Sequence, residues 1–218
     1  MHDYVNRVLQ VKGEYEIPKV FETERLIFKH PPRDYYESSE FYDFINSGED
    51  AEKMIKLNDF RANAGQEYTR SIWDLMNSRW HREDVEFLCW FIELRDKKEQ
   101  ERFEHPIIGL TNLRILRRLN KAQMGIILHP NFWGNEFSAE RAKALVDICF
   151  NSEIEIDLVE VSPQVENSKS ISSVEKYLDE LNGHRVGTIE NYQKIEEQGV
   201  VDSVLYQITK EEYRNRQA

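Results

Sequence analysis

The sequence predicts a mixed α/β (α+β) domain in which helices flank a central sheet. Runs rich in β-branched and aromatic residues, typical of strands, alternate with stretches whose apolar residues recur at helical spacing. No internal repeat and no linker rich in Pro, Gly or Ser divides these segments. The expected order is β-α-α-β-β-β-α-β-α-β-β, which is that of one mixed domain.

The N-terminal part of the chain is expected to hold one strand followed by two helices. "KVFETERLIFKH" alternates and stops at two prolines, so it predicts a strand over residues 20–29. Residues 1–18 before it are mostly polar and are expected to contain a short helix that ends at Pro18. From Asp34 to Trp80 the spacing is helical. The apolar positions of these two helices are Phe41, Phe44 and Ile45, and then Ile72, Leu75, Met76 and Trp80.

The rest of the chain alternates strands with helices. "DVEFLCWFIEL" predicts a buried strand at about 85–94, "RDKKEQERFEH" a loop, and "PIIGLTNLRIL" with "AQMGIILH" a hairpin. A strand "IEIDLVEVS" and a final pair, "HRVGTIENY" and "VDSVLYQIT", follow, and Thr209 with Glu212 predicts a capping box. The two helices between these strands carry apolar stripes at Ala142, Leu145, Val146 and Cys149, and at Ile171, Val174, Leu178 and Leu181.

Composition limits the classes of partner. The formal charge is 29 − 40 = −11, which argues against nucleic acid because phosphate binding needs a basic face. An acidic chain suits a cationic amine or peptide substrate, which long-range attraction draws in. A charged surface that only keeps the protein in solution explains the same number.

Several other classes of site find no support in the sequence. No apolar run approaches the roughly 18–20 residues that cross a bilayer, and the charged residues 1–16 are not expected to act as a signal peptide. Cys89 and Cys149 are far apart in apolar surroundings, which predicts reduced core residues in a cytoplasmic protein. The six histidines show no ligand spacing with Cys, Asp or Glu, so no metal site is expected.

The stretch "HPNFWGNEFSAERAKAL", residues 129–145, predicts an anion site. A lone glycine, Gly134, stands between a strand and a helix, and the unpaired N–H groups of a first helical turn favour a phosphate. It is neither a Walker A loop nor a dinucleotide fingerprint, which need further glycines or "GK[ST]". Glu136 places a carboxylate in the same turn. An ordinary strand-to-helix turn is the alternative.

Several motifs in order resemble one family. "FETERLIFK" is similar to an opening strand with "TERL", "PIIGLTNLRIL" to an "IG-x-x-x-L" strand, and "MGIILHPNFWG" to an "IGYWLHPxYWG" segment. "ENSKSISSVEK" fits "N-x-x-S" followed by "EK", and "DSVLYQITKEEY" resembles a closing strand. The chain thus resembles the GNAT acetyltransferases, specifically their RimJ/RimL-like branch, over nearly all of residues 20–214.

The resemblance implies a fold and a reaction. The fold is a twisted mixed sheet of six to seven strands, with two parallel strands that splay apart to admit the pantetheine arm of acetyl-CoA. One GNAT domain would occupy residues 20–214 behind an N-terminal extension, 1–19, as a cytoplasmic monomer or homodimer. The reaction would be direct attack of a primary amine, from a protein N-terminus, a polyamine or a small molecule, on the thioester carbonyl. The alternative is a degenerate GNAT domain that binds acyl-CoA or a regulatory partner without catalysis.

The resemblance also assigns site residues. Asn167 would bind pantetheine, Ser170 would donate to the departing CoA thiolate, and Glu190 would act as base through water. Asn167 as a helix N-cap, Ser170 as a first-turn hydroxyl and Glu190 as a solvent-facing residue are the structural alternatives, and bulk solvent could replace the base. The pantetheine strand is carried by Ile126, Ile127 and Leu128, and the pyrophosphate turn by Phe132, Trp133, Gly134, Asn135, Glu136, Phe137 and Ser138.

Four departures from the family pattern concern this site. Glu136 stands where the family has a second glycine, and Asn135 stands where it has a basic residue. Gln123 replaces a glutamate that is a frequent candidate for the general base, and Ile126 replaces a tyrosine. Glu136 and Gln123 favour the degenerate alternative.

Overall fold

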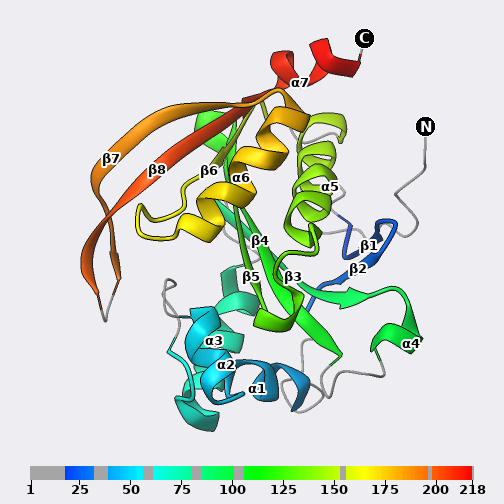
Figure 1. Ribbon diagram of the computed structural model, residues 1–218, viewed down its shortest axis with the longest axis vertical. Coiled ribbons are helices and arrows are strands. Elements are labelled where there is room, and N and C mark those ends of the chain that lie inside the picture. Colours follow the sequence, from blue (N-terminus) through cyan, green and yellow to red (C-terminus); the bar gives the residue numbers. More distant parts are fainter. Residues whose placement is uncertain are drawn as a thin grey trace.

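A computed structural model describes residues 18–31, 39–55, 61–79, 85–100, 106–152, 156–195 and 198–217. These residues form an eight-stranded mixed sheet in the order β1-β2-β3-β4-β5-β6-β8-β7 (Figure 1). The strands are β1 (Val20–Glu22), β2 (Leu26–Lys29), β3 (Val85–Leu94), β4 (Ile107–Leu116), β5 (Lys121–Leu128), β6 (Leu158–Val161), β7 (His184–Ile195) and β8 (Gly199–Thr209). The α-helices are α1 (Ser39–Ile45), α2 (Glu49–Ile55), α3 (Gly65–Arg79), α4 (Lys97–Gln100), α5 (Phe137–Asn151), α6 (Ser168–Leu181) and α7 (Lys210–Gln217).

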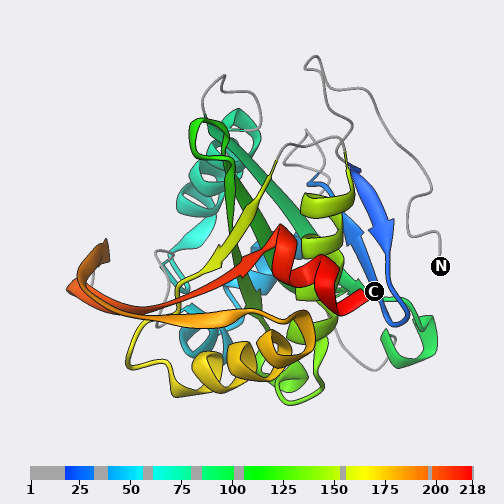
Figure 2. The ribbon, with the colours of Figure 1, turned by 90° about the horizontal axis from the view of Figure 1, so that it is seen from above.

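Helices cover the sheet in two separate groups. The larger apolar cluster joins one side of the sheet to α5 and α6, and the smaller one joins α1–α3 to β3 and β4 (Figures 1 and 2). Along β5 the side chains alternate between them: Ala122 and Met124 pack in the larger cluster, and Ile127 packs against the smaller one. The β7–β8 hairpin curves away from the rest of the molecule in both views.

The strand expected over residues 20–29 is wrong, because the chain turns back on itself there. β1 and β2 pair antiparallel, with Phe21 opposite Phe28. The Thr23 N–H donates to the Leu26 oxygen at 2.9 Å and closes the turn, while the rings of Phe21 and Phe28 stack 4.3 Å apart. Apolar residues therefore alternate on both sides of a tight turn, and the sheet has eight strands rather than six or seven.

Two further expectations need correction. The described part of the helical stretch before residue 80 contains three helices rather than two, since Gly48, with a φ of 65°, separates α1 from α2. The charged stretch expected to be a loop contains the short helix α4. The strand over 85–94, the hairpin of β4 and β5, the apolar stripes of α5 and α6, and the capping box at Thr209 are confirmed. The helix expected in residues 1–18 and Trp80 lie outside the described residues.

Two glycines on the β4–β5 hairpin give a matched test of how closely these strands approach. A methyl group added at Gly109 would lie 2.5 Å from the backbone oxygen of Ile127, whereas one added at Gly125 would lie 3.0 Å from the Asn112 side chain. A backbone oxygen cannot move aside, but a side chain can rotate. We expect Gly109→Ala to lower the free energy of unfolding by about 1–3 kcal/mol, and Gly125→Ala by under about 1 kcal/mol, in urea titrations. Equal losses would contradict the close approach of β4 and β5.

Candidate functional site

The pairing of β5 with β6 is much shorter than its pairing with β4. On one edge β5 pairs with β4 along its whole length, from Lys121 to Leu128. On the other edge its parallel pairing with β6 runs only from Lys121 opposite Leu158 to Gln123 opposite Glu160. Beyond Gln123 the two strands separate. The segment Ile126–Leu128, assigned to pantetheine by resemblance, lies past this point of separation.

A row of backbone donors begins at the turn after β5. The N–H groups of residues 134–138 make no hydrogen bond to any residue that the structure describes. They lead into the first turn of α5, a helix of 15 residues whose dipole adds positive potential at this end. Gly134 and Glu136 both adopt left-handed backbone, with φ of 81° and 63°. Alternating handedness of this kind turns successive N–H groups toward one concavity, which favours an anion.

The side chain of Glu136 makes no capping hydrogen bond at the start of α5. It is 70% exposed, and its carboxylate lies 3.7 Å from the Lys176 ammonium of α6. The residue keeps the left-handed backbone that a glycine adopts at little cost. The carboxylate in the turn is therefore largely exposed to solvent and lies within ion-pair distance of Lys176.

The β1–β2 turn braces the start of α5. The Thr23 hydroxyl donates to Glu140 at 2.5 Å, and the Arg25 backbone N–H donates to the same carboxylate at 2.8 Å. The Arg25 guanidinium binds Glu140 at 2.7 Å, donates to the Asn135 oxygen at 3.0 Å and lies over the Phe137 ring. The "TERL" motif thus contributes to the turn although it is more than a hundred residues away in sequence.

Aromatic residues fix the other side of the turn. The Trp133 indole N–H donates to the Leu128 oxygen at 2.8 Å, so it links the turn to the end of β5. The Lys169 ammonium, from the first turn of α6, lies 4.5 Å from the centre of the Trp133 ring. Phe132 and Phe137 are buried beneath. Lys169 and Lys176 therefore bring positive charge from α6 to the turn.

Asn167 and Ser170 come together at the start of α6. The Asn167 side-chain oxygen accepts the Ser170 N–H at 3.0 Å, so the residue does act as a helix N-cap. The cap uses only the oxygen of the amide. Neither the Asn167 amide nitrogen nor the Ser170 hydroxyl has a hydrogen-bond partner among the described residues, so both donors remain for a ligand.

A buried carboxylate sits where β5 and β6 separate. Glu160 is 5% exposed and accepts hydrogen bonds from Lys121 at 2.8 Å, Gln123 at 3.2 Å and Gln207 at 3.0 Å. Burial alone would raise the pKa of this carboxyl, but these three donors outweigh it and lower the pKa below its ordinary value of 4.5. Gln123 also donates to the Tyr192 hydroxyl oxygen at 3.2 Å.

Glu190 lies in an irregular part of β7. Pairing with β8 passes from Ile189 opposite Ser203 to Gln193 opposite Val201, so the intervening residues bulge. Glu190 is exposed there, and no residue of the described chain forms an ion pair or hydrogen bond with it.

Sequence reasoning missed Glu160 and Tyr192. A glutamate between two valines of a short apolar strand was a usable signal for Glu160, because a buried carboxylate needs partners. Nothing in the spacing of Tyr192 connects it with Gln123.

Comparison with known proteins decides the family. A profile described as an acetyltransferase (GNAT) domain matches residues 25–177. The chain belongs to the GNAT acetyltransferase family. The matching profile is that of the RimJ/RimL-type group within that family.

A relative found by sequence agrees with the assignment of this GNAT protein. An uncharacterized N-acetyltransferase, p20, of Bacillus licheniformis is 28% identical over 108 residues, which are 49% of this chain and 57% of that protein. The match therefore spans little more than half the length of this curated relative.

Three solved structures share the fold. A GCN5-related N-acetyltransferase from Brucella melitensis has a TM-score of 0.69 at 17% identity, over 96% of this chain and 85% of that one. A GNAT-family acetyltransferase from Bacillus anthracis has a TM-score of 0.62 at 18% identity, over 88% and 99%. The microcin self-immunity acetyltransferase MccE, in complex with acetyl-CoA and AMP, has a TM-score of 0.66 at 17% identity, over 88% and 97%.

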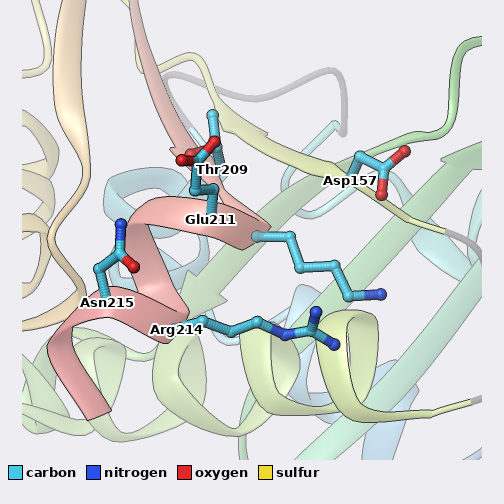
Figure 3. A pocket seen from close by; sticks show the side chains of 6 residues that line it. Asp157, Thr209, Glu211, Arg214 and Asn215 are labelled. Atoms are coloured by element: carbon cyan, nitrogen blue, oxygen red, sulfur yellow. The ribbon is translucent and has the colours of Figure 1, made fainter. Parts of the chain in front are cut away.

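A separate hollow of this GNAT protein lies beside α7 (Figure 3). Its lining comes from the residue before β6, the end of β8 and α7: Asp157, Thr209, Lys210, Glu211, Arg214 and Asn215. None of the site residues assigned from the sequence belongs to it.

Among the residues that the structure describes, no helix is long and apolar enough to cross a membrane.

The Glu160 cluster gives a prediction about stability and pH. Since the folded pKa of Glu160 is below 4.5, its ionised form stabilises the fold above that pH, and the contribution is lost as the pH falls through the folded pKa. Glu160→Gln should therefore destabilise the protein most near neutral pH and progressively less below about pH 4.5 in urea unfolding. Glu24→Gln, at an exposed position, is the control. A Glu160→Gln penalty that is independent of pH would contradict the lowered pKa.

Proposed function

We propose that this GNAT protein transfers the acetyl group of acetyl-CoA to a primary amine. The row of unpaired N–H groups at residues 134–138, next to the separation of β5 and β6, carries the proposal. A diphosphate needs several converging donors, and an extended thiol-bearing arm needs an open strand edge. Both features occur together here, and the Trp133–Leu128 hydrogen bond connects them.

In this proposal, different residues bind different parts of acetyl-CoA. Residues 132–138 hold the diphosphate, and the edge of β5 at Ile126–Leu128 receives the pantetheine arm. A backbone N–H on the unpaired edge of β5, next to Ile127, polarises the thioester carbonyl. Asn167 donates its amide nitrogen to pantetheine, and Ser170 donates its hydroxyl to sulfur as the thiolate leaves.

Positioning supplies much of the acceleration. An unprotonated amine held about 3 Å from the carbonyl carbon attacks without further chemistry by the protein. Glu190, exposed on β7, accepts the surplus proton through water, or solvent does so when the amine has a low pKa. Gln123 carries no charge and is not that base. A protein N-terminus, a polyamine and a small-molecule amine are the acceptor classes to compare.

A degenerate GNAT domain that binds acyl-CoA or a regulatory partner is the second candidate. Gln123 in place of the family's glutamate and Glu136 in place of its glycine favour it. Against it, Glu136 turns its carboxylate to solvent and toward Lys176, so the row of N–H groups stays accessible.

Acetyl-CoA should stabilise the folded protein, since a ligand that binds only the native state raises the free energy of unfolding. At a hundredfold excess over Kd the gain is about 2.7 kcal/mol, seen as a higher Tm. An amine panel with thiol detection then tests transfer. Burial raises the pKa of both Cys89 and Cys149 to about 12, so the native protein adds little thiol signal. An unmoved Tm would remove the acetyltransferase proposal, and a raised Tm without transfer would favour the degenerate domain.

Ser170→Ala should lower turnover far more than it weakens acetyl-CoA binding. The hydroxyl stabilises charge that develops on sulfur only as the bond breaks. We expect kcat to fall by about tenfold to a thousandfold, with Ser172→Ala, an exposed position on the same helix, close to wild type. Unchanged kcat would leave Ser170 with only a structural position in the first turn of α6.

Glu136→Gln should tighten acetyl-CoA binding severalfold, most clearly at low ionic strength. A charge about 6 Å from a phosphate would cost roughly 3 kcal/mol at an effective dielectric constant of about 20, but exposure and screening reduce this to under about 1 kcal/mol. Glu136→Gly should gain slightly more, because the backbone there has a φ of 63°. If Glu136→Gln instead abolishes transfer while binding persists, the carboxylate is a working part of the site.

A further inference from the structure

Tyr192 contacts a strand that is not its neighbour. It belongs to β7, which β8 and β6 separate from β5 in the sheet. Its hydroxyl nevertheless lies 3.2 Å from the amide nitrogen of Gln123 on β5. The β7–β8 hairpin must therefore bring this side chain back across the sheet to the point where β5 and β6 separate.

A bulge aims the side chain there. Asn191, beside Tyr192, has left-handed backbone with a φ of 54°, and its N–H donates to the Asp202 carboxylate of β8 at 2.8 Å. The register with β8 shifts between Ile189 and Gln193. Bulges redirect a side chain out of the regular alternation of a strand, so the Asp202 bond fixes the direction of Tyr192.

The hydrogen bonds around Gln123 have only one consistent direction. Glu160 has a lowered pKa and is ionised near neutral pH, so it can only accept. The nitrogen end of the Gln123 amide must then face it, and the second hydrogen of that nitrogen goes to Tyr192. Because the Tyr192 oxygen accepts this bond, its own hydrogen is directed away from Gln123 and has no acceptor among the described residues.

The free hydrogen lies at the vertex of the strand separation. Gln123 forms the last pair between β5 and β6. Its side chain is on the face opposite Ala122 and Met124, which pack against α5 and α6. Tyr192 therefore approaches the gap from the face opposite the α5 turn, while Ser170 on α6 belongs to the other side.

We propose that Tyr192 is a catalytic residue that donates its phenolic proton to the departing sulfur, and that Gln123 and Glu160 are positioning residues that direct this proton. The inference rests on the proposed acetyl transfer. As the amine nitrogen bonds to the carbonyl carbon, the carbon–sulfur bond breaks and its electron pair goes to sulfur. Sulfur takes the Tyr192 proton, and the surplus proton of the nitrogen passes through water to Glu190 or solvent, from which water returns a proton to the phenolate. The products are the amide and CoA thiol.

The chemistry of the two candidate donors suits different parts of this step. A phenol is far more acidic than the alcohol of a serine, so it gives up a proton to a thiolate at a smaller free-energy cost. The Ser170 hydroxyl is suited to a hydrogen bond that it does not release. Tyr192 gives its proton to the sulfur, whereas Ser170 stabilises the charge on the sulfur through a hydrogen bond.

Steady-state kinetics with the best amine of the panel separate this role from a structural one. Tyr192→Phe should lower kcat by about tenfold to a hundredfold while the Kd for acetyl-CoA stays within about twofold. Tyr206→Phe is the matched control, since it removes a tyrosine hydroxyl of β8 that donates to Glu175 at 3.0 Å and has no link to Gln123. A kcat for Tyr192→Phe within about twofold of wild type would overturn the proposal.

Gln123→Glu is the sharper variant, because it restores the glutamate that the family pattern carries. A general base at this position would raise the activity. In our proposal the new carboxylate accepts the phenolic hydrogen of Tyr192 and withdraws it from sulfur, so kcat should fall by about tenfold or more. An increase in kcat would contradict the proposed direction of the hydrogen bonds from Gln123 to Glu160 and Tyr192.

A binding measurement tests the same contact without turnover. The probes are CoA and an analogue in which a hydrogen atom replaces the thiol, compared by calorimetry at a pH where the thiol is ionised. Wild-type protein should prefer CoA by about tenfold, as a hydrogen bond to a charged group predicts, and Tyr192→Phe should lose most of that preference. Equal binding of both probes by wild type overturns the inference alone. Failure of both probes to bind removes the proposed function, and the inference with it.

Discussion

The early end of pairing between two parallel strands is the constraint on which this site depends. β5 and β6 share a ladder only from Lys121 to Gln123, although β4 supports β5 to its last residue. A strand edge without a partner exposes backbone donors and acceptors, which is costly unless water or a ligand satisfies them. In the proposed function, this unpaired edge receives an extended ligand. Because β5 leads to the turn at residues 134–138 and β6 leads to α6, this turn and the start of α6 lie at the same opening.

The charge of the whole chain is a poor guide to this opening. The net charge is −11, yet the turn combines a helix N-terminus with Lys169 and Lys176 from α6. Interactions within a few ångströms dominate over distant charges that salt screens. An anionic donor can thus bind to an acidic protein. The outward side chain of Glu136 follows the same logic, since its backbone serves the turn while its carboxylate meets Lys176 and water.

The sequence allowed the order of most elements to be predicted, including the turn that joins β5 to α5, because these depend on local patterns. The apolar stripe of α5 and the glycine before it are such patterns. The TERL segment shows the limit. Its residues alternate like one strand, but its Thr23 and Arg25 converge on Glu140 more than a hundred residues later, and no local spacing encodes that contact. The contact between Gln123 and Tyr192 could not be predicted for the same reason, because it joins two strands that are not neighbours through a bulge in β7.

Amide chemical shifts of the labelled protein during titration with acetyl-CoA test the central claim most directly, since they report on individual backbone N–H groups. The account predicts that the amides of residues 134–138 and of Ile126–Leu128 shift together and saturate at one Kd, while those beside the hollow at α7 (Figure 3) stay unchanged. Shifts confined to the α7 hollow, or none at the turn while acetyl-CoA binds, would contradict it.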